Sequence, residues 1–139
     1  MKNRLFTCIL FVVLGFLIAV GPQTIFPVCP VGDIPMKCHW TARAELGAGA
    51  LVAVTGILLL LFSNSKVRSG LSLSLVFSGI FALLIPTTLI GVCGGVHMDC
   101  NKLTLPALII LSGIVIVAAA INSLYLLSSK TKEDGKNAS

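Results

Sequence analysis

Four long runs of apolar residues, separated by short polar segments, dominate this sequence. They cover residues 5–21, 41–62, 71–91 and 105–127. Each run holds about 17 to 23 residues, which at about 1.5 Å per helical residue spans a hydrocarbon core of roughly 30 Å. A segment in that core must satisfy its backbone hydrogen bonds internally, and the alternating polarity of barrel strands is missing. The runs therefore predict an all-α membrane protein with four transmembrane helices.

The composition excludes a soluble domain. Hydrophobic residues make up 56% of the chain and charged residues only 11%, whereas soluble domains carry about 25% charged residues. An ATPase, kinase or binding domain needs roughly 100 residues of packed core, and no polar stretch approaches that length. Energy-driven activity would have to come from a partner. We predict one transmembrane domain over residues 1–127 and a disordered cytoplasmic tail over 128–139, where the sequence turns polar.

The basic residues predict the orientation. The side that holds both termini and the connection between the second and third runs carries seven of them: Lys2, Arg4, Lys66, Arg68, Lys130, Lys132 and Lys136. The other side carries three: Lys37, Arg43 and Lys102. Because the cytoplasmic side of a membrane protein is enriched in Lys and Arg, we expect both termini in the cytoplasm and the protein in the cytoplasmic membrane. The net charge of +5 thus indicates topology, and we expect no nucleic acid partner.

The first run has an alternative interpretation as a secretory signal peptide, since Lys2 and Arg4 precede it. Its length exceeds the usual apolar stretch of about 7 to 15 residues, and no convincing small-x-small cleavage site precedes Pro22. A retained helix is therefore favoured. Cleavage would leave three spans and remove Cys8.

Polar and small residues inside the spans predict local structure. Ala44, Ala48, Gly49 and Ala53 recur at helical spacing and favour close packing of the second helix. Pro86 is expected to kink the third helix, and Thr87 or Thr88 to satisfy the carbonyl that it frees.

The start of the second span carries three polar residues near the membrane boundary. Thr41 is expected to cap this helix. Glu45 is expected to be an interfacial carboxylate near the helix N-terminus, with a functional acid as the alternative. Asn122, near the end of the fourth span, is expected to face a neighbouring helix or the cytoplasmic interface.

The two outer loops form a weak internal repeat. Val28-Cys29 and Met36-Lys37-Cys38 precede the second helix, and Val92-Cys93 and Met98-Asp99-Cys100 precede the fourth. Since each unit contains two helices, the halves would be parallel hairpin repeats.

Three interpretations compete for the outer cysteines Cys29, Cys38, Cys93 and Cys100. An even number of cysteines outside the membrane predicts disulfides, with three possible connectivities. A bridge within one loop would contribute roughly 2–3 kcal/mol. Thiol-disulfide exchange is the second interpretation, because the layout resembles membrane disulfide-generating enzymes of the DsbB and vitamin K epoxide reductase types. Those enzymes use a Cys-x-x-Cys pair, which this sequence lacks.

The third interpretation is a soft-metal site. Thioether, thiolate and imidazole groups suit copper(I), and thiolate with imidazole suits zinc. The candidate ligands are Met36, Cys38, His39, His97, Met98 and Cys100. His39 fits equally well as an interfacial anchor beside Trp40.

These motifs resemble the DUF4418 family, a group of small bacterial membrane proteins of unknown function. The resemblance rests on Pro-Val-Cys at 27–29, Met-Lys-Cys-His-Trp-Thr-Ala-Arg-Ala-Glu at 36–45, and Val-Cys with His-Met-Asp-Cys within 92–100. It implies a four-helix membrane protein and no defined activity or cofactor.

We therefore expect a non-enzymatic membrane protein, an accessory component of a transporter with disulfide-pinned outer loops. Its partners would be the lipid bilayer and either a transporter complex or further copies of itself. The alternative is a protein outside the cytoplasm that handles thiols or soft metals with the outer clusters.

Overall fold

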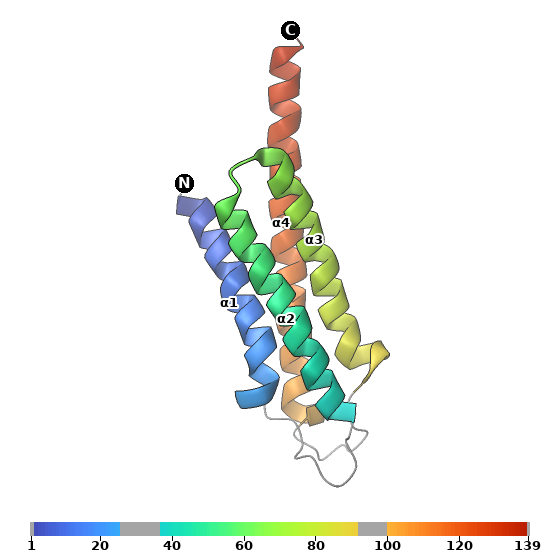
Figure 1. The fold of residues 1–139 in the computed structure, drawn as a ribbon. Coiled ribbons are helices and arrows are strands. Elements are labelled where there is room, and N and C mark those ends of the chain that lie inside the picture. The colour runs from blue at the N-terminus through green and yellow to red at the C-terminus, as the bar shows by residue number, and fades with distance from the viewer. Residues whose placement is uncertain (1, 26–36, 92–99, 139) are drawn as a thin grey trace.

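The computed structural model describes residues 2–25, 37–91 and 100–138 (Figure 1). Within these ranges the chain is helical and contains no strand. The elements are α1 (Lys2–Thr24), α2 (Lys37–Leu61), α3 (Ser65–Leu84), the π-helical turns η1 (Ile85–Leu89) and η2 (Cys100–Thr104), and α4 (Leu105–Asn137).

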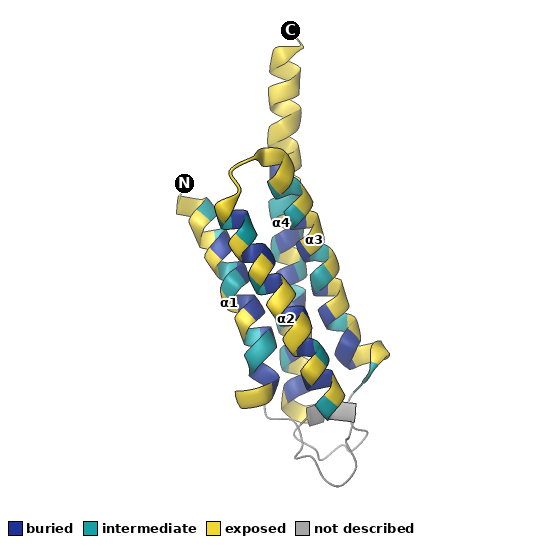
Figure 2. Ribbon diagram, in the orientation of Figure 1, coloured by how far each residue is buried: buried dark blue, intermediate teal, exposed yellow. Residues whose placement is uncertain are grey.

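Four segments are long and apolar enough to cross a membrane, which confirms the predicted class. They are Lys2–Thr24, His39–Leu61, Ser65–Leu89 and Lys102–Asn137, and each overlaps one predicted span. Exposed residues run along the outer faces of these helices (Figure 2). They include the large apolar residues Phe16, Phe77 and Leu124. Such continuous apolar surface suits a lipid environment.

The helices run up and down as two hairpins. α1 packs most extensively on α2, and α3 on α4, whereas α1 and α4 touch each other little. The predicted similarity between the two hairpins rests on residues that lie mostly outside the described ranges. Lys2, Leu61 and Ser65 lie at one end of the bundle, the terminal end (Figure 1). Thr24, His39, Leu89 and Lys102 lie at the opposite end, the distal end.

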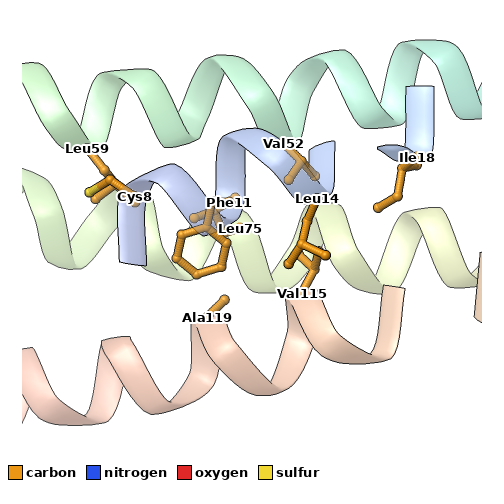
Figure 3. Close-up of a cluster of buried hydrophobic side chains, with 9 residues drawn as sticks. All are labelled: Cys8, Phe11, Leu14, Ile18, Val52, Leu59, Leu75, Val115 and Ala119. Atoms are coloured by element: carbon orange, nitrogen blue, oxygen red, sulfur yellow. The ribbon is translucent and has the colours of Figure 1, made fainter. Parts of the chain in front are cut away.

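Apolar side chains from all four helices fill the centre of the bundle (Figure 3). The cluster consists of Cys8, Phe11, Leu14, Ile18, Val52, Leu59, Leu75, Val115 and Ala119. Each is at most 8% exposed. Interiors packed in this way gain many small dispersion contacts, which drive helix association where both lipid and side chains are apolar.

Glycine lets α1 and α2 approach to backbone contact. A Cβ atom built on Gly15 would lie 2.5 Å from the amide nitrogen of Ala53 and 2.8 Å from the carbonyl oxygen of Gly49. One on Gly49 would overlap the amide nitrogen of Ala19 and lie 2.6 Å from the carbonyl oxygen of Gly15. The predicted packing role of Gly49 is confirmed, while its partner Gly15 was not predicted.

The third helix ends as Pro86 predicts. Proline lacks the amide donor that an α-helix needs, and the chain widens into the π-helical turn η1 around it. The Thr87 hydroxyl donates to the carbonyl oxygen of Leu83 at 2.7 Å, and that of Thr88 to the carbonyl oxygen of Leu84 at 3.3 Å. These bonds satisfy carbonyls near the break, as expected.

At the terminal end, polar groups tie the helices together. Asn64 caps α3 by accepting a hydrogen bond from the amide of Lys66 at 3.2 Å. The Asn122 side chain of α4 donates to the Ser72 hydroxyl of α3 at 2.7 Å, so Asn122 faces a neighbouring helix.

The C-terminal tail differs from its prediction. α4 continues to Asn137 as an exposed helix beyond the terminal end of the other helices, instead of ending in disorder at residue 128 (Figure 2). Lys and Glu are good helix formers, and a helix that is already nucleated extends at little cost per added residue.

Candidate functional site at the distal end

The most unusual group in the bundle is the carboxylate of Glu45. It lies in α2, six residues inside the start of the span at His39, or about 9 Å along the helix axis. Its side chain is 0% exposed, and neither oxygen has a hydrogen-bond partner in the structure. The expectation of an interfacial carboxylate was therefore wrong.

Glu45 belongs to the core-facing stripe of α2. Thr41, Glu45, Ala48 and Val52 follow one another at helical spacing, and all four are buried. Ala48 packs with Ala82 and Ile85 at the end of the third helix. The adjacent Gly49 lies against α1. Because Glu45 lies between the side of α2 that contacts the third helix and the side that contacts α1, it faces the middle of the bundle.

On the distal side of Glu45, a hydrogen bond joins α2 to the end of the third span. The Thr41 hydroxyl donates to the carbonyl oxygen of Gly91 at 2.7 Å. Gly91 has a φ of 75°, a conformation that favours glycine because a side chain would clash with the backbone. Thr41 does not cap α2 as predicted, since the helix begins four residues earlier at Lys37.

Two further buried hydroxyls belong to the fourth span and its entry. Thr104, the last residue of η2, is 1% exposed, and Ser112 of α4 is 0% exposed. The Ser112 hydroxyl oxygen has no hydrogen-bond partner in the structure. The distal half of the bundle thus buries a carboxylate and several hydroxyls, and the centre of the bundle next to them is apolar.

Both π-helical turns also lie at this end. η1 closes the third span, and η2 leads into α4, whose second residue is Pro106. π-Helical turns are rare and occur often at functional sites.

A buried carboxylate in this position has a limited set of chemical roles. Charged side chains inside a span are costly and rare, and those that occur pair with a partner or take part in a function. The partner would be a bound proton, a hard cation or a basic side chain. Of the described residues, no group of three His, Cys, Asp or Glu side chains forms a metal site.

Most of the predicted loop residues lie outside the described part of the chain. These are Cys29, Met36, Cys93, His97 and Met98. Cys38 and Cys100 lie in the first turns of α2 and η2, at the distal end, but their side chains are not described. The starts of α2 and η2, which carry these two cysteines, therefore lie at the same end of the bundle.

His39 is the one predicted ligand whose side chain is described. It is partly exposed and meets the ring of Trp40 edge to face, with ring centroids 6.2 Å apart and an interplanar angle of 77°. Trp40 itself is 58% exposed. An exposed aromatic pair at a helix start is typical of an interfacial anchor. The fifth cysteine, Cys8, is free and buried in the core.

The burial of Glu45 could have been predicted from the helical spacing of the residues around it, although its position near the end of the span favours an interfacial carboxylate. It occupies the same helical stripe as the apolar Ala48 and Val52, and this stripe continues to the buried Leu59. Periodicity identifies the face, but which face is turned inward depends on where α1 and α3 pack.

No curated protein and no solved structure matches the chain significantly. The model of one protein family, described as a domain of unknown function (DUF4418), matches residues 11–126. The match includes the close contact of α1 with α2, the distal end with Glu45, and most of α4. Since it covers most of the chain, this protein belongs to the DUF4418 family.

Proposed function

We propose that the protein is a non-enzymatic, multi-pass component of the cytoplasmic membrane that serves as an accessory subunit of a transporter. In this proposal both termini are cytoplasmic, and the distal end is the functional face outside the cytoplasm. Disulfides among Cys29, Cys38, Cys93 and Cys100 would pin the loops of that face.

The filled apolar centre of the bundle carries this proposal. Phe11, Val52, Leu75 and Val115 come from four different helices and are each 0% exposed (Figure 3). They lie between the buried polar groups of the distal end and the Ser72–Asn122 bond of the terminal end. A bundle with such a centre offers no polar path through its own axis, which favours a partner as the transporting subunit.

The positive-inside rule supports the orientation. Lys2, Arg4, Lys66 and Arg68 lie at the terminal end, and the tail helix beyond it adds further lysines. At the distal end the exposed basic residues are Arg43 and Lys102, of those whose side chains are described. Basic residues near span ends set the orientation of short-loop membrane proteins.

Cysteine accessibility tests the filled centre. Val52→Cys and Val115→Cys would be treated in intact and permeabilised cells with a membrane-impermeant maleimide, and labelling read at peptide level by mass spectrometry. Both should stay unlabelled until the protein is denatured. Labelling of both in the native protein would demonstrate a water-filled path and refute the proposal.

A third cysteine variant, Ser63→Cys in the exposed turn between α2 and α3, tests the orientation. It should be labelled only after permeabilisation. Labelling in intact cells would show that this turn lies outside the cytoplasm and would contradict the proposed orientation. The accessory role is tested by native mass after mild solubilisation: migration of the 14.6 kDa chain alone, or only as multiples of itself, would refute it.

A second candidate is thiol or soft-metal handling at the distal end. The specific observation in its favour is that α2, with Cys38 and His39 in its first turn, and η2, beginning at Cys100, both start at the end that buries Glu45. Zinc accepts thiolate, imidazole and carboxylate ligands.

This candidate makes its own predictions. Purified wild-type protein should carry copper or zinc that the Cys38→Ser and Cys100→Ser variants lose, while Cys8→Ser, a core substitution, retains it. Equal metal content in all variants would rule out the metal site. In intact cells, outer cysteines that can be alkylated only after reduction would favour structural disulfides, and reactive ones would favour thiol exchange.

A further inference from the structure

A cleft of about 800 Å³ opens at the terminal end of the bundle, far from Glu45. Its walls come from the first turns of α1 and the last membrane-spanning turns of α4, and Arg68 of α3 closes one side. The cleft forms where α1 and α4 diverge, since these two helices contact each other little. Its volume lies within the range of about 300–1,000 Å³ that is typical of ligand sites.

The cleft is strongly basic. Lys2, Arg4 and Arg68 line it, and none of the described residues in its walls is a carboxylate. Asn122 and Tyr125 add an amide and a phenol to the lining. Three cations gathered without a counter-charge repel one another, and an anion between them would relieve that repulsion.

The two arginines differ in how they are held. Arg4 donates to the Ser63 hydroxyl at 3.1 Å and to the carbonyl oxygen of Leu60 at 3.3 Å, which fixes its guanidinium against the end of α2. The Nε atom of Arg68 is buried and has no hydrogen-bond partner in the structure. The protein therefore leaves the guanidinium of Arg68 less fully hydrogen-bonded than that of Arg4.

Apart from Asn3 and Thr7, the rest of the lining is apolar and continues onto the lipid-facing surface. Phe6 of α1 is 71% exposed and Ile121 of α4 is 62% exposed, with the half-buried Leu10 deeper in the cleft. These residues lie on the span side of the basic groups. A ligand that suits both parts has an anionic head and apolar tails.

We propose that this cleft binds one anionic phospholipid. The headgroup phosphate accepts from the cationic side chains of Lys2, Arg4 and Arg68, and the acyl chains lie along Phe6 and Ile121. Basic pockets between transmembrane helices recognise lipid headgroups in this way. The site is independent of the transporter role proposed above, because it involves only the terminal end of the isolated bundle.

Lipid binding is tested on the purified protein in nanodiscs of zwitterionic phosphatidylcholine. Phosphatidylglycerol would be titrated in, and retained lipid counted by native mass spectrometry after gentle release. We expect phosphatidylglycerol to be retained preferentially over phosphatidylcholine, and the preference to fall as ionic strength rises. Equal retention of the two lipids would overturn the proposal.

Variants locate the site. Arg68→Gln should weaken phosphatidylglycerol retention at least tenfold, and Lys2→Gln, a change at an exposed residue of the lining, about fivefold. The matched control is Lys66→Gln, which removes an exposed charge at the same end but outside this cleft. Equal effects of Lys66→Gln and Lys2→Gln would mean that the lipid is attracted by the general positive charge of this surface. That result would refute a specific site.

A free anion is the competing occupant. Inorganic phosphate at millimolar concentration should not displace phosphatidylglycerol from the wild-type protein, because it lacks the acyl chains that Phe6 and Ile121 contact. Displacement by phosphate alone would identify an anion site and contradict the lipid assignment.

Discussion

Gly49→Ala should loosen the contact between α1 and α2 more than any other single-methyl change in α2. The added Cβ would overlap the backbone nitrogen of Ala19 and lie 2.6 Å from the carbonyl oxygen of Gly15, where ordinary contact begins near 3.4 Å. Both obstacles are backbone atoms, so no rotamer change relieves the clash. The two helices must instead separate by roughly 1 Å, which forfeits a quarter to a half of each dispersion contact along the seam.

The magnitude follows from two opposing terms. Alanine is a better helix former than glycine by about 0.5–1 kcal/mol. Overpacking against a fixed neighbour costs about 1–3 kcal/mol, and the rigid backbone here places the penalty at the upper end. We expect a net loss of about 2 kcal/mol in the free energy of unfolding.

The assay is unfolding by sodium dodecyl sulfate in mixed micelles, followed by far-UV circular dichroism. Gly47→Ala is the matched control, because it lies one half-turn away in α2 and its Cβ would meet nothing within 4 Å. That variant should equal the wild type or gain up to about 0.5 kcal/mol. If both variants unfolded at the same detergent fraction as wild type, the close backbone contact would not support the fold.

Three other substitutions test the packing and the buried polar groups in the same assay. Phe11→Ala, at a fully buried site, should lower the free energy of unfolding by about 2 kcal/mol through the cavity that it leaves. Phe16→Ala, at a site 63% exposed on the same helix, should change it little. Equal losses would mean that Phe11 does not pack in the core. Ser72→Ala and Asn122→Ala should show a coupling of about 0.6 kcal/mol in a double-mutant cycle, and additive effects would contradict their 2.7 Å hydrogen bond. Glu45→Gln should stabilise the fold by about 1–3 kcal/mol, because a buried carboxylate without a partner opposes folding; a destabilised variant would reveal a bound partner that compensates the charge.

The helical spans could be predicted from sequence because a lipid environment leaves few alternatives. A backbone that crosses hydrocarbon must satisfy its own hydrogen bonds, so an apolar run of sufficient length predicts a helix whatever its detailed sequence. Pro86 with its neighbouring threonines was predictable for the same reason, since proline removes one donor and hydroxyls are the local substitutes. The tail was mispredicted because polarity excludes a packed core but does not prevent a helix from extending.

Helix faces were harder to predict than helix existence. In a soluble protein, polarity marks the exposed face of a helix, but here both the lipid-facing and the buried faces are apolar. Ser74 and Ser78 have the spacing of a packing stripe, yet Ser74 is exposed and the close contact on α3 is made by Gly79. The decisive residue of α1, Gly15, lies in a run of large apolar residues whose inward direction depends on the partner helix.

The position of Glu45 relative to these contacts constrains how anything can reach it. One turn from it toward the terminal end, Gly49 holds α2 at backbone distance from α1. One turn from it toward the distal end, the Thr41 hydroxyl donates to the carbonyl oxygen of Gly91. Parting α1 from α2, or α2 from the end of the third span, would break one of these contacts. Lateral access to Glu45 between α1 and α2, or between α2 and the end of the third span, therefore requires one of these two contacts to break.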